Sequence, residues 1–442
     1  MNYTRKLAVD ILGSIINKGS YSNIVINTEL NKSNLDDRDK GLVTEIVYGT
    51  LKHKYTIDKI LAVFLKTGTS KLDNLVLNVL RVSIYQIKYL DKIPDFAVVN
   101  EAVELVKKYK SLSSSKLVNG VLRNYLRNKD NLNIVFKSKI DEICFNYSFD
   151  PWMVDLFVKQ YGLDNAEKIL RGLNCTPDVT LRVNSLKTNY EDAYNLLYSA
   201  GYIIEEGAVC PEAIKIIKGK NIEQNPLFKD GLATVQDESA MLVAPSMDIK
   251  EGLTVLDLCS APGGKATHIA EIMNNTGKVY AFDVHKDKLS LIKENADRLA
   301  ISNIEYAVLD STTYDEKLNN TADRVLIDVP CSGLGIIRKK PEIKWTKNNN
   351  QLKDLVNIQK SIMNNASKYV KVGGVLMYST CTLNKKENEE NVKWFLSKFK
   401  NFSIEPLYFG TAENIIYGEL GVTILPNESM DGFFIAKFKR LQ

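Results

Sequence analysis

The sequence predicts a multidomain protein with an all-α N-terminal domain, a small α+β middle module and a C-terminal α/β domain with a doubly wound, mostly parallel sheet. Three observations predict this fold class. The chain has 442 residues, which is too long for one typical hydrophobic core. Apolar residues recur at helical spacing through the first 140 residues, and apolar strand-like runs alternate with helical segments from about residue 250 onward. We expect the three domains to span residues 1–140, 141–240 and 241–442.

The first region is predicted to be helical and basic. Apolar residues at positions i, i+3, i+4 and i+7 mark helices over residues 5–16, 40–65, 72–90 and 100–109. Residues 1–140 contain 23 lysines and arginines against 13 aspartates and glutamates, a balance of +10 in a chain whose net charge is +5. A basic domain on a mildly acidic remainder favours a polyanionic partner, although solvated lysine-rich helix faces would give the same balance.

The middle module is predicted from short alternating elements. Asp150 and Pro151 begin a helix as N-cap and first-turn residue, and residues 179–187 and 214–219 are typical of strands on either side of a helix at 189–201. The C-terminal domain has buried-strand runs at residues 253–259, 277–284, 304–310, 324–330 and 373–380. A last strand at 431–440 is expected to run antiparallel.

Composition excludes several classes of protein. The six cysteines are dispersed without a CxxC pair, and only three histidines are present. We therefore expect no disulfide framework, no zinc or other metal site and no Ser-His-Asp triad. The cysteine usage is typical of a protein of the reducing cytoplasm. No apolar run is long enough to span a bilayer, so no membrane association is expected.

The segment "DLCSAPGGKATH" (Asp257–His268) joins a predicted strand to a helix through paired glycines, which is typical of a nucleotide-type pocket. It is not a P-loop, because Ala266 stands where a Ser or Thr would bind magnesium and Cys259 replaces the leading glycine. It also lacks the GxGxxG pattern of dinucleotide-binding proteins.

Three aspartates follow successive predicted strands. Asp283 is placed to accept hydrogen bonds from a ribose diol, Asp310 could face an adenine amino group, and Asp328 ends the fourth strand. Together with the glycine loop, they favour S-adenosylmethionine over ATP or NAD as the cofactor. Aspartates that only cap loops would be the alternative.

Two cysteines, Cys331 and Cys381, follow strand-like runs near this pocket. A thiolate that adds to carbon-6 of a pyrimidine makes carbon-5 electron-rich enough to capture a methyl group, and a second thiol could assist the later elimination. Two buried, inert cysteines are the alternative. Spacing alone does not decide which cysteine attacks.

The segments "DLCSAPGGKATH", "DVPCSGLG", "YSTCTL" with "ENEENV", and "DGFFIAKF" resemble the RNA cytosine-5 methyltransferases of the Sun/Nop family. The N-terminal helices resemble the NusB-like RNA-binding domain, a pairing typical of the bacterial Sun branch, which methylates a cytosine of 16S ribosomal RNA. The resemblance implies a Rossmann-like methyltransferase domain that works through a covalent bond between a cysteine and carbon-6.

The resemblance also implies residue roles. Cys381 would be the nucleophile, Cys331 would assist elimination, and Asp328 would contact the ring as well as the cofactor. The other residues implied in binding S-adenosylmethionine are Cys259, Ser260, Ala261, Pro262, Gly263, Gly264, Lys265, Asp283 and Asp310. Many family members have threonine directly after the lysine, where this chain has Ala266-Thr267, so the contacts of this loop are expected to differ in detail.

Three further segments are expected to meet RNA. Residues 336–345, "IIRKKPEIKW", combine basic residues with a tryptophan, a mixture that suits single-stranded RNA, unless the loop is solvated and the tryptophan is part of a core. Residues 179–187 and 233–240 are expected to shape the RNA groove. We expect a cytoplasmic monomer that binds ribosomal RNA and not DNA.

Other functions stay open at this point. The chain could methylate transfer RNA or another ribosomal site, or it could be a non-catalytic RNA-binding assembly factor. DNA cytosine methylation, with attack from the Pro330-Cys331 pair, would leave Cys381 without a role.

Overall fold

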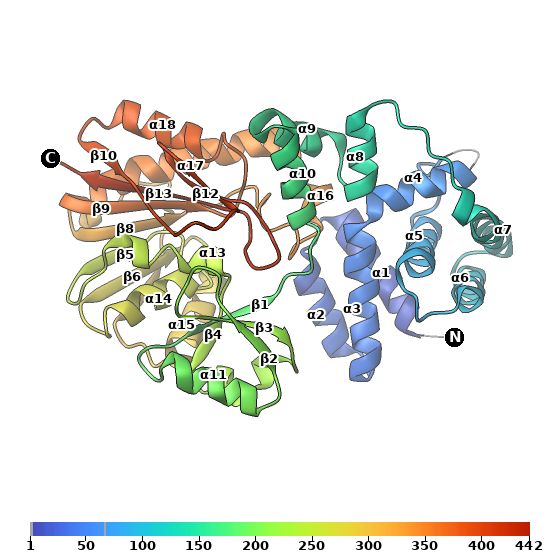
Figure 1. Ribbon diagram of the computed structural model, residues 1–442, viewed down its shortest axis with the longest axis horizontal. Coiled ribbons are helices and arrows are strands. Elements are labelled where there is room, and N and C mark those ends of the chain that lie inside the picture. The colour runs from blue at the N-terminus through green and yellow to red at the C-terminus, as the bar shows by residue number, and fades with distance from the viewer. Residues whose placement is uncertain (1–2, 66–67) are drawn as a thin grey trace. The chain divides into compact units, whose positions relative to one another are not determined.

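The computed structural model describes residues 3–65 and 68–442, and the chain divides into two compact units. Unit 1 comprises Met1–Asn174 together with Ile337–Lys347, and unit 2 comprises Cys175–Ile336 and Asn348–Gln442 (Figure 1). The chain therefore leaves unit 2 after Ile336, contributes a short segment to unit 1 and returns at Asn348. The expected division at residues 140 and 240 stays a prediction, since these units follow other boundaries.

Unit 1 is built of helices, as the apolar periodicity predicts. The helices are α1 (Tyr3–Lys18), α2 (Ser22–Lys32), α3 (Asp37–Lys52), α4 (Lys54–Phe64), α5 (Asn74–Tyr89), α6 (Asp95–Tyr109), α7 (Leu112–Asn128), α8 (Lys139–Tyr147), α9 (Pro151–Tyr161), α10 (Leu163–Gly172) and α16 (Ile343–Thr346). Local capping sets several starts; the Asp73 carboxylate, for example, accepts hydrogen bonds from the backbone of Leu75 and Val76. The apolar faces of α1, α3 and α5 meet in one core that contains Leu12, Val47 and Leu80.

Unit 2 contains a small antiparallel sheet in the order β2-β3-β1-β4. Its elements are β1 (Val179–Val183), α11 (Tyr190–Ser199), β2 (Ile203–Glu206), β3 (Ala213–Lys218), α12 (Pro226–Lys229) and β4 (Ala233–Val235). The predicted strand–helix–strand pattern of the middle module is confirmed.

The larger sheet of unit 2 has the order β11-β12-β13-β9-β8-β5-β6-β7, with β10 paired to β13. Its strands are β5 (Thr254–Asp257), β6 (Lys278–Asp283), β7 (Ile304–Val308), β8 (Ala322–Asp328), β9 (Val370–Thr380), β10 (Phe402–Glu405), β11 (Ile415–Gly418), β12 (Gly421–Ile424) and β13 (Phe433–Arg440). Strands β9, β8, β5, β6 and β7 are parallel, and β13 pairs antiparallel to β9, as expected of the last strand.

Helices cover both faces of this sheet: α13 (Glu238–Met241), α14 (Gly264–Ile272) and α15 (Leu289–Arg298) lie with one core, and α17 (Asn349–Tyr369) and α18 (Glu389–Lys398) with the other. Val255 packs with Ile269 of α14, whereas its neighbour Leu256 packs with Met363 of α17. Burial on both faces explains why the strands read as continuous apolar runs. No helix in the described residues is long and apolar enough to cross a membrane.

Candidate active site

The carboxyl ends of the parallel strands gather the predicted site residues. Asp257, Asp283 and Asp328 are the last residues of β5, β6 and β8, and Asp310 follows β7 by two positions. Because β8, β5, β6 and β7 are neighbours in the sheet, all four carboxylates lie along one edge. Ligands of open α/β sheets bind outside this edge.

The loop between β5 and α14 turns sharply at Gly263. Gly263 has φ +98°, and a Cβ atom there would lie 3.2 Å from the Cα of Ile292. Its N–H donates to the Ser260 carbonyl at 2.7 Å, which closes the turn. Only glycine combines this conformation with such close packing, so Gly263 is a requirement of the loop itself.

The carboxylates surround this loop. Asp283 accepts hydrogen bonds from Ala261 N at 3.3 Å and His285 N at 2.9 Å, and exposed Asp310 accepts from Thr312 N at 3.0 Å. Burial raises the pKa of the Cys259 thiol well above its usual value, and the charges of Asp257, Asp328, Asp283 and Asp310 raise it further. The loop thus lies in a negative field, which suits a cationic ligand.

Asp257 is a site residue to which the sequence reasoning gave no role. Its side chain is buried, and burial raises its pKa to about 7, with a further contribution from Asp328. A carboxyl group whose pKa lies near 7 would lose its proton more readily when a positive charge binds beside it. The sequence feature that could have indicated Asp257 is its position at the end of a predicted strand, directly before the glycine loop.

Asp328 is held by two partners. Lys265 Nζ lies 2.7 Å from Asp328 Oδ2, and Ser379 Oγ donates to Oδ1 at 2.7 Å. Burial is the largest single influence and would lower the pKa of Lys265, but the charge of Asp328, the hydrogen bond to it and the charge of Asp257 together outweigh burial, and the pKa is raised. The loop lysine and the strand-end aspartate therefore form an ion pair that joins the predicted cofactor loop to the cysteine-bearing strands.

The two cysteines meet, as the strand order requires. Strands β8 and β9 are adjacent and parallel with Asp328 opposite Ser379, and Cys331 Sγ lies 3.2 Å from Cys381 Sγ. The hydrogen bond to Cys381 raises the pKa of Cys331 well above its usual value, and burial raises it further. None of the six cysteines forms a disulfide in the described part of the chain.

A buried carboxylate joins the loops that carry these cysteines. Glu387 accepts hydrogen bonds from Ser332 N at 2.9 Å, Ser332 Oγ at 2.6 Å, Gln359 Nε2 at 2.9 Å and Asn384 Nδ2 at 3.0 Å. Ser332 follows Cys331, and its hydroxyl lies 2.7 Å from the hydroxyl of Thr382, which follows Cys381. The sequence alone gives no role to the segment "ENEENV". Its first glutamate, Glu387, joins the loops that carry the two thiols and so helps to hold the thiols at this spacing.

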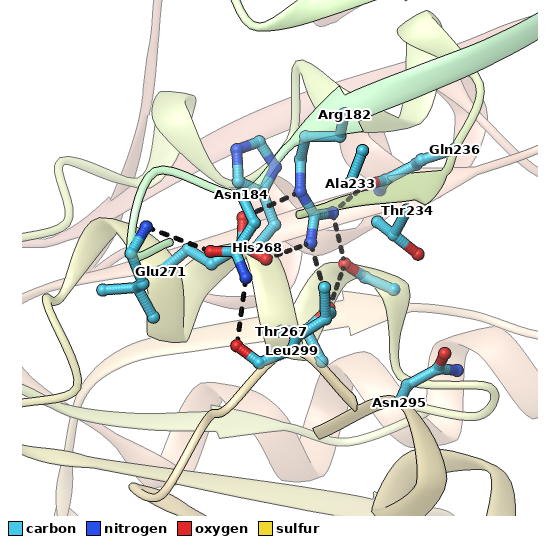
Figure 2. A network of polar contacts seen from close by, with 12 residues as sticks. Arg182, Asn184, Ala233, Thr234, Gln236, Thr267, His268, Glu271, Asn295 and Leu299 are labelled. Atoms are coloured by element: carbon cyan, nitrogen blue, oxygen red, sulfur yellow. Dashed lines mark hydrogen bonds and ion pairs between the residues drawn. The ribbon is translucent and has the colours of Figure 1, made fainter. Parts of the chain in front are cut away.

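A second buried network joins the small sheet to α14 (Figure 2). Arg182 of β1 pairs with Glu271 through two hydrogen bonds, and it also donates to Thr267 Oγ1, the Gly264 carbonyl and Gln236. Thr267, at the predicted departure from the family pattern, thus contacts an arginine and the carbonyl of Gly264.

Two of the side chains on which the RNA prediction for residues 336–345 relied, Lys344 and Trp345, are bound within unit 1, and RNA contact by the rest of the segment stays a prediction. Lys344 is fully buried in unit 1, where its ammonium donates to the carbonyls of Lys52 and Ser148 and to Asn174 Oδ1. Trp345 Nε1 donates to the Leu51 carbonyl at 2.8 Å. The segment is a structural part of the helical unit. The alternative interpretation therefore holds for the tryptophan, which is part of a core, but not for its expectation of a solvated loop.

Several polar residues of the segments 179–187 and 233–240 are buried: Arg182, Asn184, Gln236 and Glu238. Glu238 accepts from the backbone of Ala208 and Cys210 at 2.9 and 2.7 Å. These side chains organise the interior of unit 2, and a part for the two segments in shaping an RNA groove stays a prediction.

Comparison with known proteins defines the class first. Residues 244–439 match the family described as 16S rRNA methyltransferase RsmB/F, residues 2–127 match the NusB family, and residues 149–223 match the ferredoxin-like domain of RsmF/B-like methyltransferases. The fold and the loop are those of an S-adenosylmethionine-dependent RNA methyltransferase with a NusB-like domain.

Two relatives of similar sequence show to which family of methyltransferases the chain belongs. The chain is 37% identical to the probable ribosomal RNA small subunit methyltransferase B of Bacillus subtilis, over 99% of this chain and 98% of that one. It is 32% identical to ribosomal RNA small subunit methyltransferase B of Proteus mirabilis, over 90% and 92% of the two chains. The crystal structure of PH0851 is similar over 98% of both chains, with 27% identity and a TM-score of 0.83. The chain belongs to the ribosomal RNA small subunit methyltransferase B family.

Proposed function

We propose that this chain transfers a methyl group from S-adenosylmethionine to carbon-5 of a specific cytosine in 16S ribosomal RNA, through a covalent bond between Cys381 and carbon-6. The observation that carries the proposal is the 3.2 Å separation of the Cys331 and Cys381 sulfur atoms beside Asp328. Methyl transfer to an amine or hydroxyl needs no thiol, whereas carbon-5 of a pyrimidine needs covalent activation. The names of the relatives support ribosomal RNA as the substrate.

The residues of the loop fit the cofactor. S-adenosylmethionine, when bound, supplies a methyl group on a cationic sulfur atom, and the four carboxylates around Cys259 provide the matching negative field. In this proposal Asp283 binds the ribose and Asp310 the adenine. The loop between them and Asp328 contacts two of these carboxylates, through Ala261 N to Asp283 and Lys265 Nζ to Asp328. The loop residues proposed to bind the cofactor are Cys259, Ser260, Ala261, Pro262, Gly263, Gly264 and Lys265.

The geometry of the cysteine pair permits the roles proposed for Cys381 and Cys331. The two sulfur atoms lie 3.2 Å apart, and the hydrogen bond to Cys381 together with burial raises the pKa of Cys331, so a protonated Cys331 can donate to a Cys381 thiolate and stabilise it. The Cys381 thiolate then forms a bond to carbon-6, the electron pair of the carbon-5–carbon-6 double bond takes the methyl group at carbon-5, and S-adenosylhomocysteine is the leaving group. In the second half, Cys331 first gives its proton to solvent, and its thiolate takes the proton from carbon-5. The electrons of that C–H bond restore the ring double bond, the bond between carbon-6 and Cys381 breaks, and Cys381 leaves as a thiolate.

The ring needs an acid or a hydrogen bond on its Watson–Crick edge while electrons move. Asp328 is the candidate, because its carboxylate contacts Lys265 of the cofactor loop on one side and Ser379, close to Cys381, on the other. The base must leave any stack to reach the buried thiols, so a loop or an opened helix is the expected substrate.

The test is methyl transfer to deproteinised 16S ribosomal RNA, with nucleoside mass spectrometry and position mapping of the product. We expect 5-methylcytosine at one position, and its absence from the ribosomal RNA of cells without the gene. A methyl group on another atom, or on transfer RNA only, contradicts the proposal. The cytoplasmic setting and the monomeric state stay predictions.

A further inference from the structure

We propose that Arg182 is a positioning residue for S-adenosylmethionine: from the small antiparallel sheet, it holds the first turn of α14 and thereby sets the shape of the cofactor loop. Arg182 lies in β1, outside residues 244–439 that match the methyltransferase family. The inference rests on the proposed cofactor site, because it concerns the loop that leads into Gly264.

Every donor of the Arg182 guanidinium has an acceptor. Nε and Nη2 donate to the two carboxylate oxygens of Glu271 at 3.0 and 2.9 Å, and Nη2 also donates to Thr267 Oγ1 at 3.1 Å. Nη1 donates to the Gly264 carbonyl at 2.9 Å and to Gln236 Oε1. Guanidinium has five N–H donors in a fixed fork, so the five bonds leave none unused.

The acceptors span helix α14. Gly264 is its first residue and Glu271 lies in its last turn, so the Arg182 side chain binds both ends of the helix. The Gly264 carbonyl lies one residue after Gly263, whose left-handed turn closes the loop. Moving the first turn of the helix would therefore move Ala261 and Gly263, which pack against Asp283 and Ile292.

The side chain is wholly buried, so its charge serves no partner in solvent. Glu271 alone would satisfy the charge, and a buried pair of this kind is weak evidence for stability. The bond to the Gly264 carbonyl adds something different, because it fixes a backbone position beside the ligand loop. Lysine would keep the charge opposite Glu271, but its single ammonium lacks the fork that reaches Gly264 and Glu271 together.

Asn184 provides a matched control on the same strand-to-loop segment. Its Nδ2 donates to the carbonyls of Gly231 at 2.9 Å and Leu299 at 3.0 Å, which joins the small sheet to the end of α15. Neither acceptor belongs to the cofactor loop. Asn184 is buried as Arg182 is, so its loss measures the general cost of weakening this junction.

The experiment compares the full chain with Arg182→Lys, Asn184→Ala and Asp283→Ala, using calorimetry with S-adenosylmethionine and methylation kinetics on 16S ribosomal RNA. For Arg182→Lys we expect the Kd and KM for the cofactor to rise about tenfold, the size expected for one lost hydrogen bond to a charged group. The kcat at saturating cofactor should stay near wild type, since no reacting group changes. Asn184→Ala should lower the thermal midpoint without changing the Kd.

Wild-type cofactor affinity in Arg182→Lys, with weakened affinity in Asp283→Ala, overturns this inference and leaves the site in place. Unchanged affinity in both variants overturns the proposed site itself. A fall in kcat for Arg182→Lys with an unchanged KM also contradicts a positioning role. If Arg182→Lys does not fold, the double variant Arg182→Met/Glu271→Met removes both buried charges and should show the same rise in Kd.

Discussion

The sulfur atoms of Cys331 and Cys381 lie 3.2 Å apart at the ends of adjacent parallel strands. We predict that the two thiols have separable roles. Cys381→Ala should give neither methylation nor an adduct, because the attacking thiolate is gone. Cys331→Ala should permit attack but slow elimination, so a protein–RNA band should survive denaturing electrophoresis. Cys175→Ala, which changes a cysteine outside the pair, should behave as wild type. A stable adduct with Cys381→Ala and none with Cys331→Ala would invert the assignment.

Asp283 should contribute directly to cofactor affinity. Asp283→Ala removes a charge-assisted hydrogen-bond acceptor for the ribose and should weaken binding by about 1.5–3 kcal/mol. Calorimetry measures this, and the exposed Asp287 nearby offers a control, since Asp287→Ala makes the same charge change outside the site. Equal effects of the two variants would mean that only the local field matters.

Cofactor binding should depend on pH through Asp257. Its folded pKa of about 7 lies above the ordinary value of 3.8, so its contribution to stability is present below about pH 4 and is lost as pH rises through 7. A cationic cofactor favours the carboxylate, so affinity should rise with pH through the same range and binding should release protons. Calorimetry in buffers of different ionisation enthalpy detects the release. Asp257→Asn should abolish it, and an unchanged release would assign it to another group.

Glu387 should be a stability residue of the cysteine loops. Glu387→Ala removes four hydrogen bonds to a buried carboxylate and should lower the free energy of unfolding by about 3 kcal/mol or more. Denaturant unfolding monitors the loss. Exposed Glu390, three residues on, should change stability by no more than about 0.5 kcal/mol when replaced by alanine.

RNA binding by the helical unit should be strongly salt-dependent. Arg123 and Arg127 are exposed on α7 beside Phe96, in a groove between α6 and α7. We expect affinity for a 16S ribosomal RNA fragment to fall steeply with salt, and replacing each arginine by alanine should reduce the slope of log K against log salt by about one. Lys250→Ala, which removes an exposed charge just before β5, should leave the slope unchanged. A flat salt response would contradict phosphate contacts in this unit.

Local patterns predicted the elements and the meeting of the two cysteines well. Cys331 and Cys381 follow apolar runs of a parallel sheet, and strand ends of one such sheet lie along one edge by geometry. The same patterns misassigned Lys344, since a charged residue in a short motif looks exposed when the sequence is read locally, and they gave no sign that Arg182 is buried. Their burial depends on acceptors far along the chain: the carbonyls of Lys52 and Ser148 for Lys344, and Glu271 for Arg182. Periodicity carries no information about such distant partners.

The segment Ile337–Lys347 makes the protein hard to divide. It belongs to the helical unit, yet in the sequence it lies between Cys331 and Cys381 of the other unit. A fragment beginning at Cys175 would carry Lys344 and Trp345 without the carbonyls of Ser148 and Leu51 that satisfy them, and a fragment ending at Asn174 would leave those carbonyls bare. Gain or loss of the N-terminal helices in evolution therefore requires two simultaneous edits, one at the end of the chain and one in the middle of the gene. We expect shortened relatives to carry a rewritten loop at this point.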